Sequence, residues 1–229
     1  MKLRNLHPWD VSTEEAREIQ RQLRERIVLK PPSGFKPRRV AGADLSIRWK
    51  RDRGYAAIVT LDAESLETVE EATAVVDVTF PYVPGLLSFR ELPPLAAAWK
   101  RLRRKPDVII FDGHGIAHPR RFGIACHGGL LFDVPSIGCA KSLLVGTHGP
   151  LGEKRGATAE IEIDGEVVGM AVRTRDGVKP VYVSPGHLMD LPTAVEVVLS
   201  MGAGYREPET TRRSHALVNR MRREGEAAE

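Results

Sequence analysis

The stretch that ends at Asp112 constrains the fold of this chain more than any other. Residues 108–111 are all apolar, and Asp112 is followed by a loop rich in glycine and histidine that runs to Gly129. An unbroken apolar run bounded by glycine is typical of a strand buried on both faces of a sheet. An acidic residue and a glycine-rich loop at the end of such a strand indicate an active site at that point.

Asp44 lies in a second predicted strand, residues 40–47, whose other members are mostly small or apolar. Alternation along the strand puts the odd-numbered residues on one face and Asp44 on the other. Burial of a carboxylate without a partner or a metal is costly, so Asp44 must have a compensating neighbour.

A helix is predicted over residues 88–103, because Ser88 and Glu91 have capping-box spacing and apolar residues follow at helical intervals. This helix provides a crossover that returns the buried strand 107–111 parallel to the Asp44 strand. Parallel pairing brings Asp44 and Asp112 to adjacent points of the sheet.

The remaining patterns predict a single α/β domain over residues 1–229. Strands at 54–62 and 73–78 follow the Asp44 strand through short connections, which favours an antiparallel meander. Residues 1–35 form an N-terminal helix and loop; the helix begins at Ser12, and we expect it to pack on the sheet. The other predicted elements are a short helix at 128–132, strands at 135–140 and 181–184, a hairpin at 160–170 with its turn at Asp164 and Gly165, helices at 191–201 and 207–223, and a disordered tail at 224–229.

Composition favours a soluble intracellular protein. Lys and Arg exceed Asp and Glu by 34 to 30, a net charge of +4, with basic clusters at 36–39, 48–53, 101–105 and 212–223. Each cluster is either solvated surface charge or a patch that meets a polyanion. Cys126 and Cys139 have no metal or redox spacing, and no apolar run reaches the ~20 residues that span a bilayer. We therefore expect a cytoplasmic protein with reduced thiols and no membrane partner.

Asp44, Glu91 and Asp112 form a predicted carboxylate cluster. Hard oxygen ligands with open positions suit Mg²⁺ or Mn²⁺, which keep water and phosphate oxygens as further ligands. The alternative is that each acid is an ordinary surface residue or a helix cap. Lys141, at the end of a predicted strand, would hold a phosphate oxygen or the attacking water, so the set is compatible with hydrolysis of a phosphodiester bond.

His114 and His118 have the spacing of a helical zinc pair, but the neighbouring glycines and Pro119 make a helix improbable there. A flexible loop that lets backbone amides approach a ligand, with His118 and Arg120 on phosphate, fits these residues better. A structural role for the histidines is the alternative.

Long motifs occupy four segments: Val40–Ser46, Phe80–Glu91, Asp112–Ala125 and Gly138–Ser142. In their order and at about their spacing, these motifs resemble the deoxyinosine-specific endonuclease V family. The resemblance extends from Val40 to His215 near the C-terminus. It implies a ribonuclease-H-like fold, in which helices flank a central mixed β-sheet.

The same resemblance implies a reaction and a set of site residues. The reaction would be a Mg²⁺-dependent nick at the second phosphodiester bond on the 3′ side of deoxyinosine, a deaminated adenine, leaving a 3′-hydroxyl and a 5′-phosphate. Mn²⁺ would substitute for Mg²⁺; the partner would be damaged DNA or inosine-containing RNA, and the protein a monomer. The metal ligands would be Asp44, Glu91 and Asp112, with Lys141 and His215 assisting at the scissile phosphate. The substrate-binding residues would be Pro81, Tyr82, Val83 and Pro84 as a wedge between the strands, His118 on the nucleic acid, and Leu86, Gly113, Gly123 and Ile124 around a flipped base.

A rigid Pro-Tyr-Val-Pro loop is suited to fill the gap left by an extruded base, a step that costs roughly a few kcal/mol. The number of metal ions stays open. Two other interpretations also remain: another ribonuclease-H-like nuclease that acts on inosine-containing RNA or branched DNA, and a non-catalytic nucleic-acid-binding module. Clustered carboxylates argue against the second, because a surface that binds a polyanion gains nothing from them.

Overall fold

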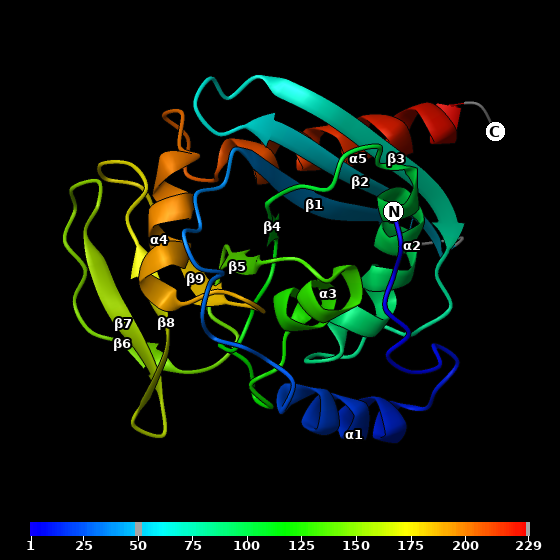
Figure 1. Cartoon of the computed structure of the whole chain (residues 1–229), viewed down its shortest axis with the longest axis horizontal. Helices are drawn as coiled ribbons and strands as arrows, with labels where there is room; N and C mark the ends of the chain where they lie inside the picture. The colour runs from blue at the N-terminus through cyan, green and yellow to red at the C-terminus, as the bar shows by residue number, and fades with distance from the viewer. Residues whose placement is uncertain (49–51, 228–229) are drawn as a thin grey trace.

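The computed structural model describes residues 1–48 and 52–227, so residues 49–51 of one basic cluster and residues 228–229 of the expected tail lie outside the described part. Within that part, every strand joins one sheet in the order β3-β2-β1-β4-β5-β9-β8-β7-β6 (Figure 1). The strands are β1 (Arg39–Arg48), β2 (Arg53–Asp62), β3 (Thr68–Asp77), β4 (Val108–Phe111), β5 (Ser136–Ala140), β6 (Thr147–His148), β7 (Thr158–Ile163), β8 (Glu166–Val172) and β9 (Val181–Pro185). The helices are α1 (Thr13–Arg24), α2 (Leu87–Arg101), α3 (Ile124–Phe132), α4 (Leu191–Ser200) and α5 (Glu209–Ala227).

The pairing of β1 with β4 confirms the expected crossover. The two strands run parallel, with Val40 opposite Val108 and Ala43 opposite Phe111. β5 continues the parallel part beside β4, whereas β2, β3 and β9 pair antiparallel with their neighbours. The expected α/β fold with a central mixed sheet flanked by helices is therefore confirmed, and so is the antiparallel meander of β1 to β3.

The sheet separates two hydrophobic cores, one on each face. On one face α2 and α3 pack on β1 to β4, where Trp99 and Phe132 stack with their ring centroids 4.4 Å apart. On the other face α4 and α5 cover β5, β9 and the middle strands, around Ile110, Val183 and Val198. Covered on both faces, the short strand β4 is fully buried, as its apolar sequence predicts.

Helix α1 begins as expected, but it does not pack on the sheet. The Ser12 hydroxyl and the Glu15 carboxylate form a reciprocal capping box. The buried side of α1, around Leu23, contacts α3 and the loop before it, and Figure 1 shows α1 below α3, away from the strands. The expected packing was wrong because amphipathic spacing defines which side of a helix is buried, not which element covers it.

The start of α2 also differs from the prediction. The helix begins at Leu87, its N-cap residue Leu86 makes no side-chain capping bond, and Ser88 lies inside the first turn. The Ser88 hydroxyl bonds to the His127 ring instead, at 3.0 Å. Ser88 and Glu91 therefore form no capping box, and the Glu91 carboxylate remains available for the site.

Two helices are longer than the sequence pattern predicts. α3 begins at Ile124, before the expected 128–132. Its first turn is held by the Ala125 amide, which donates to the His114 carbonyl at 3.0 Å, an ordinary hydrogen-bond distance. α5 runs to Ala227, so residues 224–227 of the expected disordered tail are helical. Arg222 pairs with Glu226 one turn later at 2.9 Å, which supports this last turn. None of the helices in the described part is long and apolar enough to cross a membrane.

Candidate active site

Three neighbouring strands position the main polar groups. Asp44, inside β1, and Asp112, just after β4, each lie one residue beyond the last pair of the β1–β4 ladder, and Lys141 follows the last residue of β5. The chain therefore brings these side chains together by strand order alone. α2 supplies Glu91 from the sheet face where it packs, and α5 supplies His215 from the opposite face.

Close packing of α5 on β1 brings His215 to Asp44. A Cβ atom on Gly42 would lie 2.3 Å from the backbone of Thr210, so only glycine permits this approach. The His215 ring then donates from Nδ1 to Asp44 Oδ2 at 2.7 Å. This bond to a carboxylate raises the pKa of His215 above its ordinary value.

Glu91 lies near both aspartates. Burial, together with the negative charges of Asp44 and Asp112, raises the pKa of Glu91 well above its usual value. Like charges have this effect only at short range, so Asp44 and Asp112 both act electrostatically on Glu91, while the convergence of the three carboxylates on one metal ion stays a prediction.

The donor set of this cluster fits a hard divalent cation. All three acids offer carboxylate oxygens, and the mutual repulsion that raises the pKa of Glu91 is what a bound cation relieves. Among the described residues, no three acidic, histidine or cysteine side chains already converge on one point that could hold a metal. Two basic groups occupy the oxygens instead: Lys141 Nζ lies 2.6 Å from Asp112 Oδ2, and His215 lies against Asp44.

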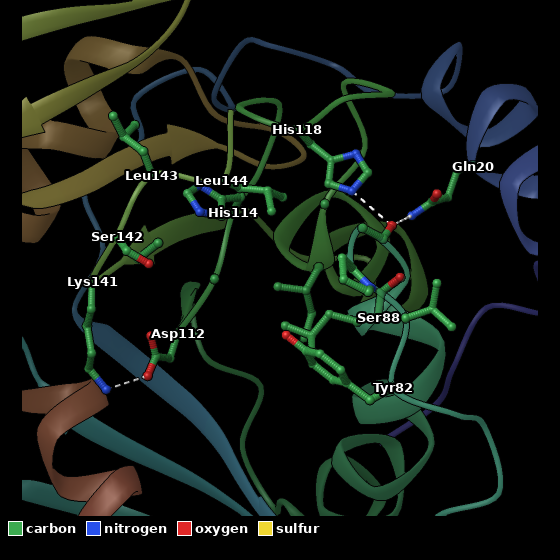
Figure 2. A pocket seen from close by; sticks show the side chains of 18 residues that line it. Gln20, Tyr82, Ser88, Asp112, His114, His118, Lys141, Ser142, Leu143 and Leu144 are labelled. Atoms are coloured by element: carbon green, nitrogen blue, oxygen red, sulfur yellow. Dashed lines mark hydrogen bonds and ion pairs between the residues drawn. The ribbon is translucent and has the colours of Figure 1, made fainter. Parts of the chain in front are cut away.

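A cavity of about 260 Å³ opens beside Asp112 (Figure 2). Its volume is slightly below the range of about 300–1,000 Å³ typical of pockets for small molecules. The lining residues are Gln20, Tyr82, Val83, Pro84, Gly85, Leu87, Ser88, Asp112, Gly113, His114, His118, Gly123, Ile124, Ala140, Lys141, Ser142, Leu143 and Leu144. Asp112 and Lys141 lie at one side of this cavity in Figure 2 and Tyr82 at the other.

Most of the predicted substrate-binding residues line this cavity, but two do not. Tyr82, Val83, Pro84, Gly113, His118, Gly123 and Ile124 belong to the lining. Leu86 is fully buried as the N-cap of α2, and Pro81 is exposed outside the cavity. The cavity is thus built between the predicted wedge loop and the loop after Asp112.

The loop after Asp112 is closely packed at two of its glycines. A Cβ on Gly115 would lie 1.9 Å from the carbonyl oxygen of Pro185, and one on Gly123 would lie 2.2 Å from that of His114. These glycines therefore serve close backbone packing. The approach of backbone amides in this loop to a ligand stays a prediction.

Both ring nitrogens of His118 are engaged within the protein. Nε2 contacts the Gly85 carbonyl at 2.9 Å, and Nδ1 accepts from the Arg120 amide at 3.1 Å. Burial, then the charge of Arg120, lowers the pKa of His118 to about 4. Gln20 and Arg120 also donate to the Gly85 carbonyl, at 3.0 and 2.8 Å. His118 therefore holds the predicted wedge loop in place, while its contact with nucleic acid stays a prediction.

Sequence reasoning missed several groups at the site. Glu207 lies 3.2 Å from Lys141 Nζ, although its segment carries no motif. Gln20 comes from the buried side of α1, where a polar residue at a core position was an available signal. Leu143 and Leu144, separated from Lys141 by Ser142, also line the cavity, with Leu144 exposed.

Comparisons with known proteins identify the family of this chain. A model of the endonuclease V family matches residues 21–216. An endonuclease V from Myxococcus xanthus is 68% identical over 222 residues, which cover 96% of this chain and 94% of that protein.

Solved structures extend the likeness to three dimensions. The crystal structure of endonuclease V from Streptomyces avermitilis superposes with a TM-score of 0.90 at 46% identity, covering 95% of this chain and 96% of that one. The Ciona intestinalis endonuclease V, in complex with a 24mer DNA containing an inosine followed by a ribo-adenosine, gives a TM-score of 0.81 at 26% identity, covering 92% and 98%.

The fold and these relatives define an α/β endonuclease, which is a hydrolase. Within that class, the chain belongs to the endonuclease V family.

Proposed function

We propose that this protein is a Mg²⁺-dependent repair endonuclease that nicks the second phosphodiester bond on the 3′ side of deoxyinosine, leaving a 3′-hydroxyl and a 5′-phosphate. The observation that carries the proposal is the position of Asp112, whose charge acts on the buried Glu91 carboxyl and which also lines the cavity. The Ciona intestinalis relative, which is in complex with inosine-containing DNA, supports this substrate.

Asp44, Glu91 and Asp112 are the proposed metal ligands. When bound there, Mg²⁺ lowers the pKa of a coordinated water and offsets charge on the attacked phosphate. Mn²⁺, which prefers the same oxygen ligands, is expected to substitute. Lys141 donates from Nζ to a non-bridging oxygen of the scissile phosphate, and His215 orients Asp44 through their 2.7 Å bond.

Recognition of the damaged base is assigned to the cavity. Tyr82, which is 66% exposed, stands on the Pro81–Pro84 wedge and is placed to occupy the gap that the extruded base leaves. The backbone around Gly113, Gly123 and Ile124 borders the space for the base. Extrusion costs least for a base that is already weakly paired, as deoxyinosine is, and this favours deoxyinosine over an undamaged base.

Substitution of either aspartate tests the metal site. Asp44→Ala and Asp112→Ala should each slow Mg²⁺-dependent nicking of an inosine-containing duplex by about a hundredfold or more, because each removes a ligand and a charge. Single-turnover assays on an end-labelled duplex measure the rate and the position of the cut together. Asp176→Asn is the matched control, since Asp176 is an exposed acid paired with Lys154 on a distant loop. Full Mg²⁺-dependent activity of either alanine variant would contradict the assignment of that aspartate as a metal ligand.

A second substrate deserves the same assay, because the DNA bound by the Ciona intestinalis relative carries a ribo-adenosine after the inosine. A panel of inosine in DNA, inosine in RNA, inosine followed by one ribonucleotide, and a four-way junction separates the candidates. Faster cutting of the RNA would assign the protein to inosine-containing RNA, and cutting of the junction alone would exclude the deoxyinosine proposal.

A further inference from the structure

Glu207 is a fourth acidic residue at the site. It precedes α5 in the segment that leads from α4, and its carboxylate lies 3.2 Å from Lys141 Nζ. Lys141 Nζ also lies 2.6 Å from Asp112, so the ammonium group is held between two carboxylates. An additional negative charge beside a site for a polyanion opposes substrate binding, so its presence calls for a compensating role.

The backbone around Glu207 is fixed on both sides. The Arg206 guanidinium donates through Nη2 to the Lys141 carbonyl at 2.5 Å and to the Pro180 carbonyl at 2.7 Å. The Arg206 carbonyl in turn accepts from the Thr174 hydroxyl at 2.6 Å. Arg206 thus ties the segment to the end of β5, and Glu207 has little freedom to leave Lys141.

The Asp112 carboxylate cannot pair at full strength with both the Lys141 ammonium group and a metal ion. This carboxylate is one of the proposed metal ligands, and its Oδ2 now accepts a hydrogen bond from Lys141 Nζ at 2.6 Å. A cation bound to this carboxylate would therefore share the negative charge that now faces Lys141. When Asp112 turns to a cation, Lys141 loses one of its two counter-charges. Glu207, which is not one of the proposed ligands, keeps the other in place.

We propose that Glu207 is a positioning residue that draws the Lys141 ammonium away from Asp112 and holds it at the scissile phosphate when a metal ion binds. The proposal rests on the proposed function, because it concerns the same metal ligands and the same lysine. Glu207 touches neither the substrate nor the metal in this assignment; it acts through Lys141.

Glu207→Gln tests this role, because it keeps the size of the side chain and removes the charge. Without Glu207, Lys141 competes with the cation for Asp112, so Mg²⁺ affinity of the full chain should fall by about tenfold, the usual effect of losing an outer partner of a metal site. Isothermal titration with Mg²⁺ in the absence of nucleic acid measures it. Single-turnover nicking at saturating Mg²⁺ should also slow by about tenfold, because the lysine is no longer held.

A double-mutant cycle with Lys141→Met separates positioning from a general charge effect. In the Lys141→Met background, Glu207→Gln should change Mg²⁺ affinity by less than about twofold, since the group through which Glu207 acts is gone. The same tenfold loss in both backgrounds would overturn the proposal and assign Glu207 a direct electrostatic role. An unchanged affinity in the single variant would overturn it as well.

Two controls keep the outcomes distinct. Asp176→Asn removes a Lys–carboxylate pair of similar length, 3.1 Å, on another loop, and should leave Mg²⁺ affinity unchanged. Thermal unfolding of each variant shows whether the fold is intact; if Glu207→Gln unfolds, Glu207→Asp, which keeps the charge, replaces it and should retain most of the affinity. If the wild-type protein fails to nick inosine duplexes, the proposed function fails, while the Mg²⁺ titrations still decide the role of Glu207.

Discussion

At the scale of single residues, His118 shows how burial converts a histidine into a neutral structural link. Its ring accepts one hydrogen bond and donates another, so only the neutral form satisfies both partners. Burial lowers its pKa to about 4, from an ordinary value of 6.5. The link should therefore be intact at neutral pH and fail when the ring takes up a second proton.

The lowered pKa predicts how stability depends on pH. Because the unfolded chain binds this proton more readily, the contribution of His118 is complete above the unfolded pKa of 6.5 and is lost as pH falls toward the folded value of about 4. The difference in free energy of unfolding between the wild type and His118→Ala should shrink over that window in urea titrations. His148→Ala, on the edge strand β6, is the control. A difference that does not vary with pH would contradict the assignment.

Some site residues were predictable from local sequence and others were not. Asp112 was predictable because it follows a buried strand, and Asp44 because it interrupts an otherwise small or apolar one. The parallel pairing of β1 with β4 brings the two positions together. Glu207 was not, because its place depends on contacts that Arg206 makes with Lys141 and Pro180, far away in the chain. The roles of the predicted residues in binding and catalysis await the experiments above.

At the scale of elements, the wedge loop is a short segment fastened at both ends. The Arg90 guanidinium donates to the Phe80 carbonyl at one end, and Gln20, His118 and Arg120 share the Gly85 carbonyl at the other. Two prolines between these anchors restrict the backbone further. Tyr82 is thus presented from a rigid support, which reduces the entropy lost when the ring meets a nucleic acid.

Removal of the Tyr82 ring should weaken discrimination rather than general binding. Tyr82→Ala is expected to reduce the preference for inosine-containing over undamaged duplex by about tenfold, since aromatic–base stacking contributes roughly 1–3 kcal/mol. Tyr82→Phe keeps the ring and should retain the preference. Gel-shift titrations of both duplexes at one fixed salt concentration give the ratio. Equal ratios for wild type and Tyr82→Ala would contradict the wedge role.

The sequence predicted the secondary-structure elements better than the packing contacts between them. The apolar patterns and turn residues of the sequence predicted β1, β4 and the hairpin of β7 and β8. The turn residues of this hairpin, Asp164 and Gly165, both have positive φ. The same kind of pattern did not predict that α1 would pack on α3, because a buried polar group such as Gln20 finds its partners only in the folded chain. Local rules therefore set the elements, and long-range contacts set the arrangement around the cavity.

At the scale of the whole molecule, the site depends on the core beneath it. The ring of Phe132 stacks on Trp99 and lies 6.2 Å from the ring of Phe111, which directly precedes Asp112. Cys126 is also fully buried, and burial raises the pKa of its thiol to about 12, so it is protonated and inert while the protein is folded.

This arrangement links core packing to both stability and access. Phe132→Ala should lower the free energy of unfolding by about 3–5 kcal/mol, because it removes a fully buried ring and leaves a cavity below β4. Urea titration measures the loss, and the exposed Val69→Ala on β3 is the control, expected to change stability by no more than about 0.5 kcal/mol. Since Cys126 reacts only from opened molecules, its modification by a thiol reagent should accelerate in Phe132→Ala. The logarithm of the modification rate should rise in proportion to the stability lost, provided that opening and closing are fast relative to modification. A destabilised variant with unchanged thiol reactivity would show that Cys126 is reached by local opening of α3, independent of the core that supports Asp112.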